Sequence, residues 1–122
     1  MDDIKWCICG KIGQQEHHII FRSQNRNLIQ CKMNQISLCA SCHDAIHRGT
    51  GYKLDKLLKL QLQNNLEILF DKEWLTKEEI NEVLQISEKA LNSLFKTIQS
   101  KGNKYTREDC IRTIMGGKVQ LE

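Results

Sequence analysis

The chain lacks the apolar segments that membrane and secreted proteins need. Within its 122 residues no apolar run approaches the roughly 20 residues that cross a bilayer, and the opening Met-Asp-Asp-Ile-Lys-Trp has no apolar core of a signal peptide. We therefore expect a cytoplasmic protein without membrane contact. Because cytoplasmic thiols stay reduced, the six cysteines favour metal binding over a framework of disulfides.

The chain also offers little material for a large core. Its length allows one domain or two very small ones. A lobe of about 50 residues buries too little apolar surface to be stable alone, and a structural zinc ion is a usual remedy. The net charge of +3 is only a weak hint of an anionic partner, so the placement of the charges is more informative.

Histidine and cysteine gather in one stretch, residues 16–47. It contains a Cys-x-x-Cys pair, Cys39 and Cys42. It also holds every histidine of the chain, namely His17, His18, His43 and His47. Any one of these histidines alone is better explained as an ordinary core or surface residue, but the joint pattern is the commonest signature of a metal site.

The spacing within residues 40–48 predicts two separate metal sites if this segment is helical. His43 and His47 are four residues apart, so they share a helix face and can hold one ion. Cys42 points about 100° away from His43 around the helix axis. It can therefore join Cys39 at a second, thiolate site for structural zinc.

Two strands are expected before this helix, at residues 16–21 and 34–38. Since neighbours in a strand face opposite sides, His17 and His18 cannot easily share one task. One of them can bind metal while the other faces a substrate. The helix itself is expected to end at the two glycines that follow it.

The arm at the start of the chain has the pattern of a zinc knuckle. In Trp-Cys-Ile-Cys-Gly-Lys, residues 6–11, the glycine allows the tight turn that lets amides face thiolates. The alternative is a pair of buried free cysteines. The predicted zinc ligands are Cys7, Cys9, Cys39 and Cys42.

These motifs together resemble the HNH, or ββα-metal, endonucleases. The resemblance rests on His-His-Ile at 17–19 and on Asn34, five residues before the first cysteine of Leu-Cys-x-x-Cys-His-x-x-x-His at 38–47. It covers about residues 7–51, under half of the chain. In that family a hairpin and a helix clasp one divalent ion, and DNA phosphodiesters are cut.

The resemblance implies a role for each matched residue. His18 would be the general base that activates water, and Asn34 would orient it. A catalytic divalent cation, Mg²⁺, Mn²⁺, Ni²⁺ or Zn²⁺, would be held by His17, His43 and His47.

The chain departs from the family in two places. It has no proline, and Phe21 stands where the family often has one. Its first cysteine pair has one residue between the thiols instead of two, which gives a tighter geometry and makes Cys31 a candidate substitute ligand.

Residues 53–73 read as one leucine-rich connector helix. Such a helix usually packs on its own domain, and this one also permits a homodimer seam. Beyond it, Thr76 and Glu79 fit a capping box of one short helix, and Ser87 can cap a second after a break at 85–87.

The pattern of residues 74–122 resembles helix-turn-helix DNA-binding domains, although Gln85 stands where many have glycine. A further helix is expected within residues 105–115, capped by Thr106, with Cys110 in the core.

The charges of this unit segregate. Residues 78–88 contain four acids and no Lys or Arg, whereas residues 89–107 contain five bases and no acid. A basic second helix and loop suit a nucleic-acid groove, and a solvated basic face is the alternative. Lys32 is a further loop cation beside the site. The candidate DNA-binding residues are Arg22, Arg26, Lys89, Asn92, Ser93, Lys96, Lys101, Lys104 and Arg107.

The sequence therefore predicts a mostly helical α+β protein in three parts. A zinc-stapled ββα-metal lobe at 1–52 would be followed by a connector helix at 53–73 and a helix-turn-helix-like DNA-binding module at 74–122. The expected function is a metal-dependent HNH endonuclease acting on DNA. The alternatives are a non-catalytic, zinc-stabilised DNA-binding regulator and a nuclease acting on RNA.

Overall fold

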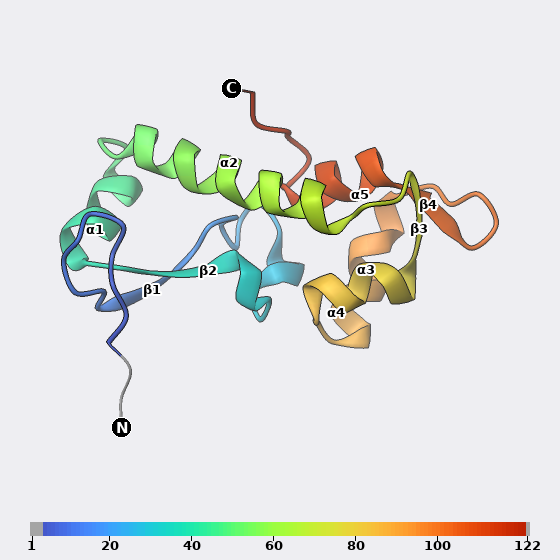
Figure 1. Ribbon diagram of the computed structural model, residues 1–122, viewed down its shortest axis with the longest axis horizontal. Helices are drawn as coiled ribbons and strands as arrows, with labels where there is room; N and C mark the ends of the chain where they lie inside the picture. Colours follow the sequence, from blue (N-terminus) through green and yellow to red (C-terminus); the bar gives the residue numbers. More distant parts are fainter. Residues whose placement is uncertain (1–3, 122) are drawn as a thin grey trace.

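The computed structural model describes residues 4–121 and has a mixed α+β architecture. Two small two-stranded sheets lie in different halves of the molecule, and the long helix α2 (Tyr52–Leu69) runs beside both halves (Figure 1). No helix within this described part is long and apolar enough to cross a membrane.

The first half is a hairpin followed by a helix. Strand β1 (Gln15–His18) pairs antiparallel with β2 (Gln35–Leu38), and α1 (Ala40–Arg48) follows directly. Cys39 caps α1 by accepting a hydrogen bond from the backbone of Cys42, and Gly49 ends the helix at φ +85°, a conformation that favours glycine. The helix predicted at 40–48 is confirmed.

The first strand is shorter than the predicted range 16–21. Beyond His18, the backbone N–H of Ile20 donates to the side-chain oxygen of Asn34 at 2.7 Å instead of to a strand partner. Between the strands, the chain forms two short 3-10 helices, η1 (Arg26–Leu28) and η2 (Lys32–Asn34).

Helix α2 ends four residues before the predicted position 73. Its inner face consists of leucines such as Leu58, Leu62 and Leu66, all buried. Phe70 then leaves the helical region and is itself buried. The guanidinium of Arg107 donates to the carbonyls of Glu67 and Phe70, which satisfies backbone groups exposed by the helix end.

The second half alternates strands and helices. The order is β3 (Trp74–Thr76), α3 (Lys77–Leu84), α4 (Glu88–Leu94), η3 (Phe95–Thr97), β4 (Lys104–Thr106) and α5 (Arg107–Ile114). The caps at Thr76, Ser87 and Thr106 are confirmed, because each side-chain oxygen accepts a hydrogen bond from the backbone N–H three residues on. The antiparallel pairing of β3 with β4 was not predicted.

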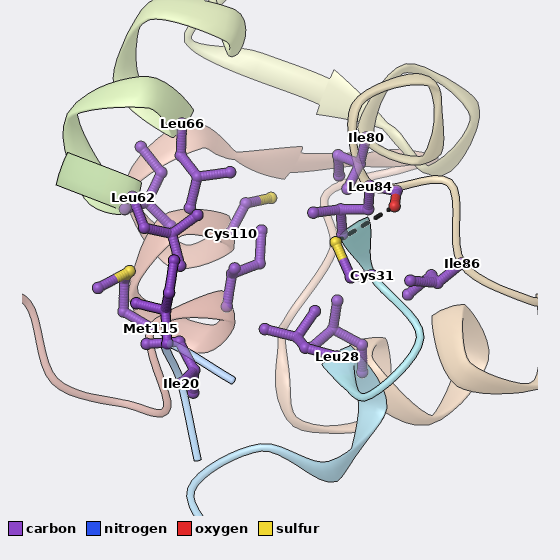
Figure 2. Packing of buried hydrophobic residues seen from close by; sticks show 14 of the residues in the cluster. Ile20, Leu28, Cys31, Leu62, Leu66, Ile80, Leu84, Ile86, Cys110 and Met115 are labelled. Atoms are coloured by element: carbon purple, nitrogen blue, oxygen red, sulfur yellow. Dashed lines mark hydrogen bonds between the residues drawn. The ribbon is translucent and has the colours of Figure 1, made fainter. Parts of the chain in front are cut away.

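One hydrophobic cluster extends through both halves. Figure 2 shows Ile20 and Leu28 from the first half packed with Leu66, Leu84 and Met115. The three predicted parts share this cluster, since buried side chains before and after residues 52 and 73 belong to it. The predicted domain boundaries at these two residues therefore stay predictions. The shared core fixes the hairpin and α1 relative to the helical half.

Candidate metal centre

Four thiols converge where the N-terminal arm meets α1. The sulfur atoms of Cys7, Cys9, Cys39 and Cys42 all lie within 4.8 Å of one another, and the Cys9 and Cys39 sulfurs are 3.7 Å apart. A tetrahedral zinc site with Zn–S bonds of about 2.3 Å places its sulfurs about 3.8 Å apart. The predicted thiolate set is therefore brought together, and it suits a structural metal such as zinc.

The electrostatics of this cluster also suit a cation. Burial raises the pKa of the Cys7 thiol, but hydrogen bonds from the backbone amides of Cys9 and Cys39 and from the Cys9 and Cys42 thiols together outweigh burial and lower that pKa to about 6. Burial and the neighbouring thiols raise the pKa of Cys42 to about 12. Four thiols this close together cannot all ionise to thiolates without a positive charge between them. A bound metal ion would supply that charge.

Cys31, the candidate substitute ligand, lies outside the thiol cluster. Its side chain is buried in the shared core and donates to the carbonyl of Leu84 at 3.3 Å (Figure 2). Cys31 is therefore not one of the four clustered thiols, and its side chain packs in the core instead. In the described part of the chain all six cysteines are free thiols, as expected for metal ligands and core residues.

Three imidazoles converge on the other side of α1. The nearest ring nitrogens of His17, His43 and His47 lie within 4.8 Å of one another, and the Nε2 atoms of His43 and His47 are 3.1 Å apart. His17 reaches them from β1, which packs against α1. The predicted separation of thiols and imidazoles on α1 is confirmed.

His17 is buried, and one of its ring nitrogens has no hydrogen-bond partner among the described residues. Only 1% of its surface is exposed, and its Nε2 atom is buried without a hydrogen-bond partner among the described residues. A buried polar atom without a partner is costly, and a metal ion is one way to satisfy it. Burial, followed by repulsion from His43 and His47, lowers the pKa of His17 to about 4. It is therefore neutral near pH 7, as a metal ligand must be.

A hydrogen bond from the strand fixes the orientation of His43. Its Nδ1 atom is hydrogen-bonded to Oε1 of Gln15, whose side chain lies on the same face of β1 as that of His17. Because an amide oxygen only accepts, Nδ1 carries the proton and Nε2 is free for a metal. Sequence reasoning missed Gln15, although strand alternation places it two residues before His17 on the same face.

The ring of Phe21 and the ion pair of Lys59 with Asp55 lie near the three imidazoles. The ring of Phe21 packs against His17 and His47, with centroids 5.8 and 5.5 Å away. The ammonium of Lys59 lies 4.2 Å from the Phe21 ring centre and 3.0 Å from a carboxylate oxygen of Asp55. Nothing in the local sequence of α2 distinguishes Asp55 and Lys59 from its exposed charged residues.

His18 lies on the opposite face of β1, as alternation predicts. Its Nε2 atom is 2.9 Å from the carbonyl oxygen of Ile29, which also accepts a hydrogen bond from Gln35. A carbonyl only accepts, so His18 donates through Nε2 and its Nδ1 carries the free lone pair. The ring is held in one tautomer with its basic nitrogen free.

The side chain of Asn34 makes no hydrogen bond to His18 among the described residues, so its expected orienting role stays a prediction. The buried Asn34 amide accepts from the N–H of Ile20 and donates to the carbonyls of Ile20 and Leu28. It thereby ties the end of β1 to the loop that carries Ile29. The direct partner of His18 is the Ile29 carbonyl, and Asn34 acts only through the backbone around it.

Most of the candidate DNA-binding residues are exposed. Arg22 and Arg26 lie on the loop after β1, Lys89, Asn92 and Lys96 lie on or just after α4, and Ser93 is half-buried. Lys101 and Lys104 pair across a tight turn with Gly102 at φ +63°. Arg107 differs from the others, since its half-buried guanidinium donates to the carbonyls of Phe70 and Glu67 at the end of α2.

Comparisons of the chain with protein-family models, with curated proteins and with solved structures gave no match. The function therefore has to be argued from the geometry of the two ligand clusters and the residues around them.

Proposed function

We propose that the protein is a metal-dependent endonuclease of the HNH type, with a zinc-stapled ββα-metal lobe that hydrolyses DNA phosphodiesters. The observation that carries the proposal is the pair His17 and His18. The first presents a buried, unpartnered Nε2 to two further imidazoles, and the second, on the opposite face, is held with a free basic nitrogen. Ligand and base functions would thus come from adjacent residues.

In this mechanism His18 is the proton acceptor. Its Nδ1 takes a proton from a water molecule, the oxygen of that water bonds to phosphorus, and the bond from phosphorus to the leaving oxygen breaks. The Ile29 carbonyl keeps the ring oriented and stabilises the imidazolium that forms. A divalent ion held by His17, His43 and His47 would supply stabilisation of the charge on the phosphate.

The C-terminal helices would add affinity for DNA. The support is four exposed lysines in this half, namely Lys89 on α4, Lys96 on η3, Lys101 in the turn before β4 and Lys104 at the start of β4. Lysines on a short helix and an adjacent hairpin can contact phosphates on both sides of a groove. Arg22 and Arg26 would extend this contact beside the imidazole site.

The test is nicking of a supercoiled plasmid by zinc-loaded protein with added Mg²⁺, Mn²⁺ or Ni²⁺. We expect cutting that requires both an added ion and His18, so that His18→Ala binds DNA but does not cut it. Asp44→Asn is the matched control, because Asp44 is an exposed α1 residue next to His43 whose ion pair among the described residues is with Arg48. It should cut at the rate of the unmodified protein.

The other outcomes separate the alternatives. If folded, zinc-loaded protein binds DNA but cuts it with none of these ions, the non-catalytic regulator replaces the nuclease. If it cuts RNA and leaves DNA intact, the substrate assignment is wrong while the mechanism stands. Cutting by His18→Ala at the full rate would contradict the assignment of His18 as the base.

A further inference from the structure

The N-terminal arm presents a tryptophan to solvent between two hollows. Trp6 is 62% exposed, although an indole of this size is usually at least half-buried. Its backbone pairs with Ile12 across the arm, directly beside the thiol cluster. The backbone bridge and the adjoining cysteine cluster define the position of the arm that carries this ring.

One of the two hollows lies on the outer face of the hairpin. Its volume is about 600 Å³, and it is lined by Lys5, Trp6, Glu16, Lys32, Gln35, Ile36 and Ser37. Glu16 and Ser37 are register partners in the hairpin, and their side chains are hydrogen-bonded across it. The hollow is therefore an open recess built on β1 and β2, with the indole at one end.

This hollow adjoins the proposed general base. Gln35 lines it and is also the register partner of His18, and both side chains donate to the Ile29 carbonyl. Glu16 and His18 are two residues apart on β1 and so share this face. If a nucleic acid were cut beside His18, the nucleotides next to the cut bond would lie at this hollow.

The charges of the hollow select one class of occupant. Lys5 and Lys32 are exposed cations at its edge, and its single acid, Glu16, lies 3.9 Å from Lys5 and is partly neutralised by it. A cationic rim around an exposed aromatic ring suits a phosphate attached to a planar base. An apolar protein segment would gain the contact with Trp6 but would offer no anionic group to the ammonium groups of Lys5 and Lys32.

We infer that this hollow is a nucleotide subsite, in which Trp6 stacks on an unpaired base next to the cut bond and Lys5 and Lys32 contact its phosphates. The inference rests on the proposed function and narrows its substrate. A base inside a duplex cannot stack on the side chain, so the substrate is single-stranded or splayed nucleic acid at that position.

The experiment uses tryptophan fluorescence. The chain has two tryptophans, so Trp74→Phe leaves Trp6 as the only probe, and His18→Ala in the same protein keeps the ligand intact. A fluorescein-labelled oligothymidylate is titrated into zinc-loaded protein without added divalent ion, and anisotropy reports binding independently. We expect Trp6 fluorescence to be quenched over the same concentration range as the rise in anisotropy.

Affinity measurements on variants give the second readout. Trp6→Ala should weaken oligothymidylate binding roughly 5- to 100-fold, and Trp6→Phe should weaken it less, because stacking needs only an aromatic face. Ile8→Ala is the matched control, since Ile8 is an exposed apolar residue of the same arm that does not line the hollow. Zinc content must be the same in all variants.

Several results would overturn the subsite. These are saturating anisotropy with unchanged Trp6 fluorescence, equal losses in Trp6→Ala and Ile8→Ala, or tighter binding of a duplex that depends equally on Trp6. Quenching and a Trp6→Ala defect in a protein that cuts nothing would keep the subsite and reject the nuclease. Absence of any oligonucleotide binding would reject both.

Discussion

Gln15 and His43 are joined by a hydrogen bond between the side-chain oxygen of the first and Nδ1 of the second. The bond connects β1 to α1 across the imidazole cluster and leaves Nε2 of His43 directed at His47, 3.1 Å away. The strand thus contributes both His17, a proposed metal ligand, and the residue that orients His43, a second proposed ligand on the neighbouring helix.

This relationship predicts a specific effect of Gln15→Leu on metal affinity. Loss of a hydrogen bond to a ligating histidine typically weakens metal binding about 10- to 100-fold, because ring orientation and basicity are lost. We expect that loss for Mn²⁺ or Co²⁺ measured by competition with a chelating dye. Gln15→Glu keeps an acceptor and should bind nearly as well as the parent.

The control for that measurement is Gln14→Leu. Gln14 is the preceding residue and is also exposed, but it makes no side-chain contact with His43 among the described residues. Equal weakening of metal binding in Gln14→Leu and Gln15→Leu would mean that leucine disturbs the hairpin at either position. That result would contradict the orienting role of Gln15.

Removal of one thiol is expected to release the structural metal. Cys39 both belongs to the four-thiol set and caps α1, so Cys39→Ser should lose zinc and lower the melting temperature of the protein. Cys31→Ala should keep a full equivalent of zinc, because Cys31 contacts Leu84 in the core. Metal analysis and thermal unfolding of both variants decide the matter, and zinc loss in Cys31→Ala would reject the assigned ligand set.

The features that sequence predicted correctly depend on short separations. His43 and His47 are one helical turn apart, and the caps at Thr76 and Ser87 each accept a hydrogen bond from the backbone three residues away. Helical periodicity and capping chemistry therefore suffice to place them. The thiol set needed one long-range inference, that the cysteines of the arm return to those of α1.

The features that sequence missed depend on partners far away in the chain. Strand β1 ends early because Asn34 binds the backbone of Ile20, 14 residues before it. Helix α2 ends early where the guanidinium of Arg107, 37 residues beyond Phe70, donates a hydrogen bond to the Phe70 carbonyl. The three-residue strands β3 and β4 are too short to show alternation. Periodicity contains no information about such partners.

Asn34→Ala should act mainly on stability. Its amide satisfies three buried backbone groups, on Ile20 and Leu28, and truncation leaves them without partners. We expect a loss of about 2 to 4 kcal/mol in the free energy of unfolding, measured by urea denaturation of zinc-loaded protein. Asn64→Ala, at an exposed position on α2, should change it by less than about 0.5 kcal/mol. An inactive Asn34→Ala with full stability would instead indicate a direct role in catalysis.

The capping box of α3 predicts a pH-dependent contribution to stability. The Glu79 carboxylate accepts hydrogen bonds from the Lys72 ammonium and from the backbone N–H of Thr76. The Lys72 contact, then the Thr76 amide, lower the pKa of Glu79 from 4.5 to about 2. A depressed pKa stabilises the fold above the unfolded value and loses that effect as pH falls through the folded one.

Glu79→Gln should therefore lower the urea midpoint at pH 6, and its difference from the parent should shrink as pH falls from 4.5 towards 2. Zinc loss in acid affects parent and variant alike, so the difference between them isolates Glu79. Glu78→Gln is the matched control, because Glu78 is an exposed acid in the same helical turn. A difference for Glu79→Gln that stayed constant down to pH 2 would show that the glutamine perturbs packing and that the carboxylate charge contributes nothing.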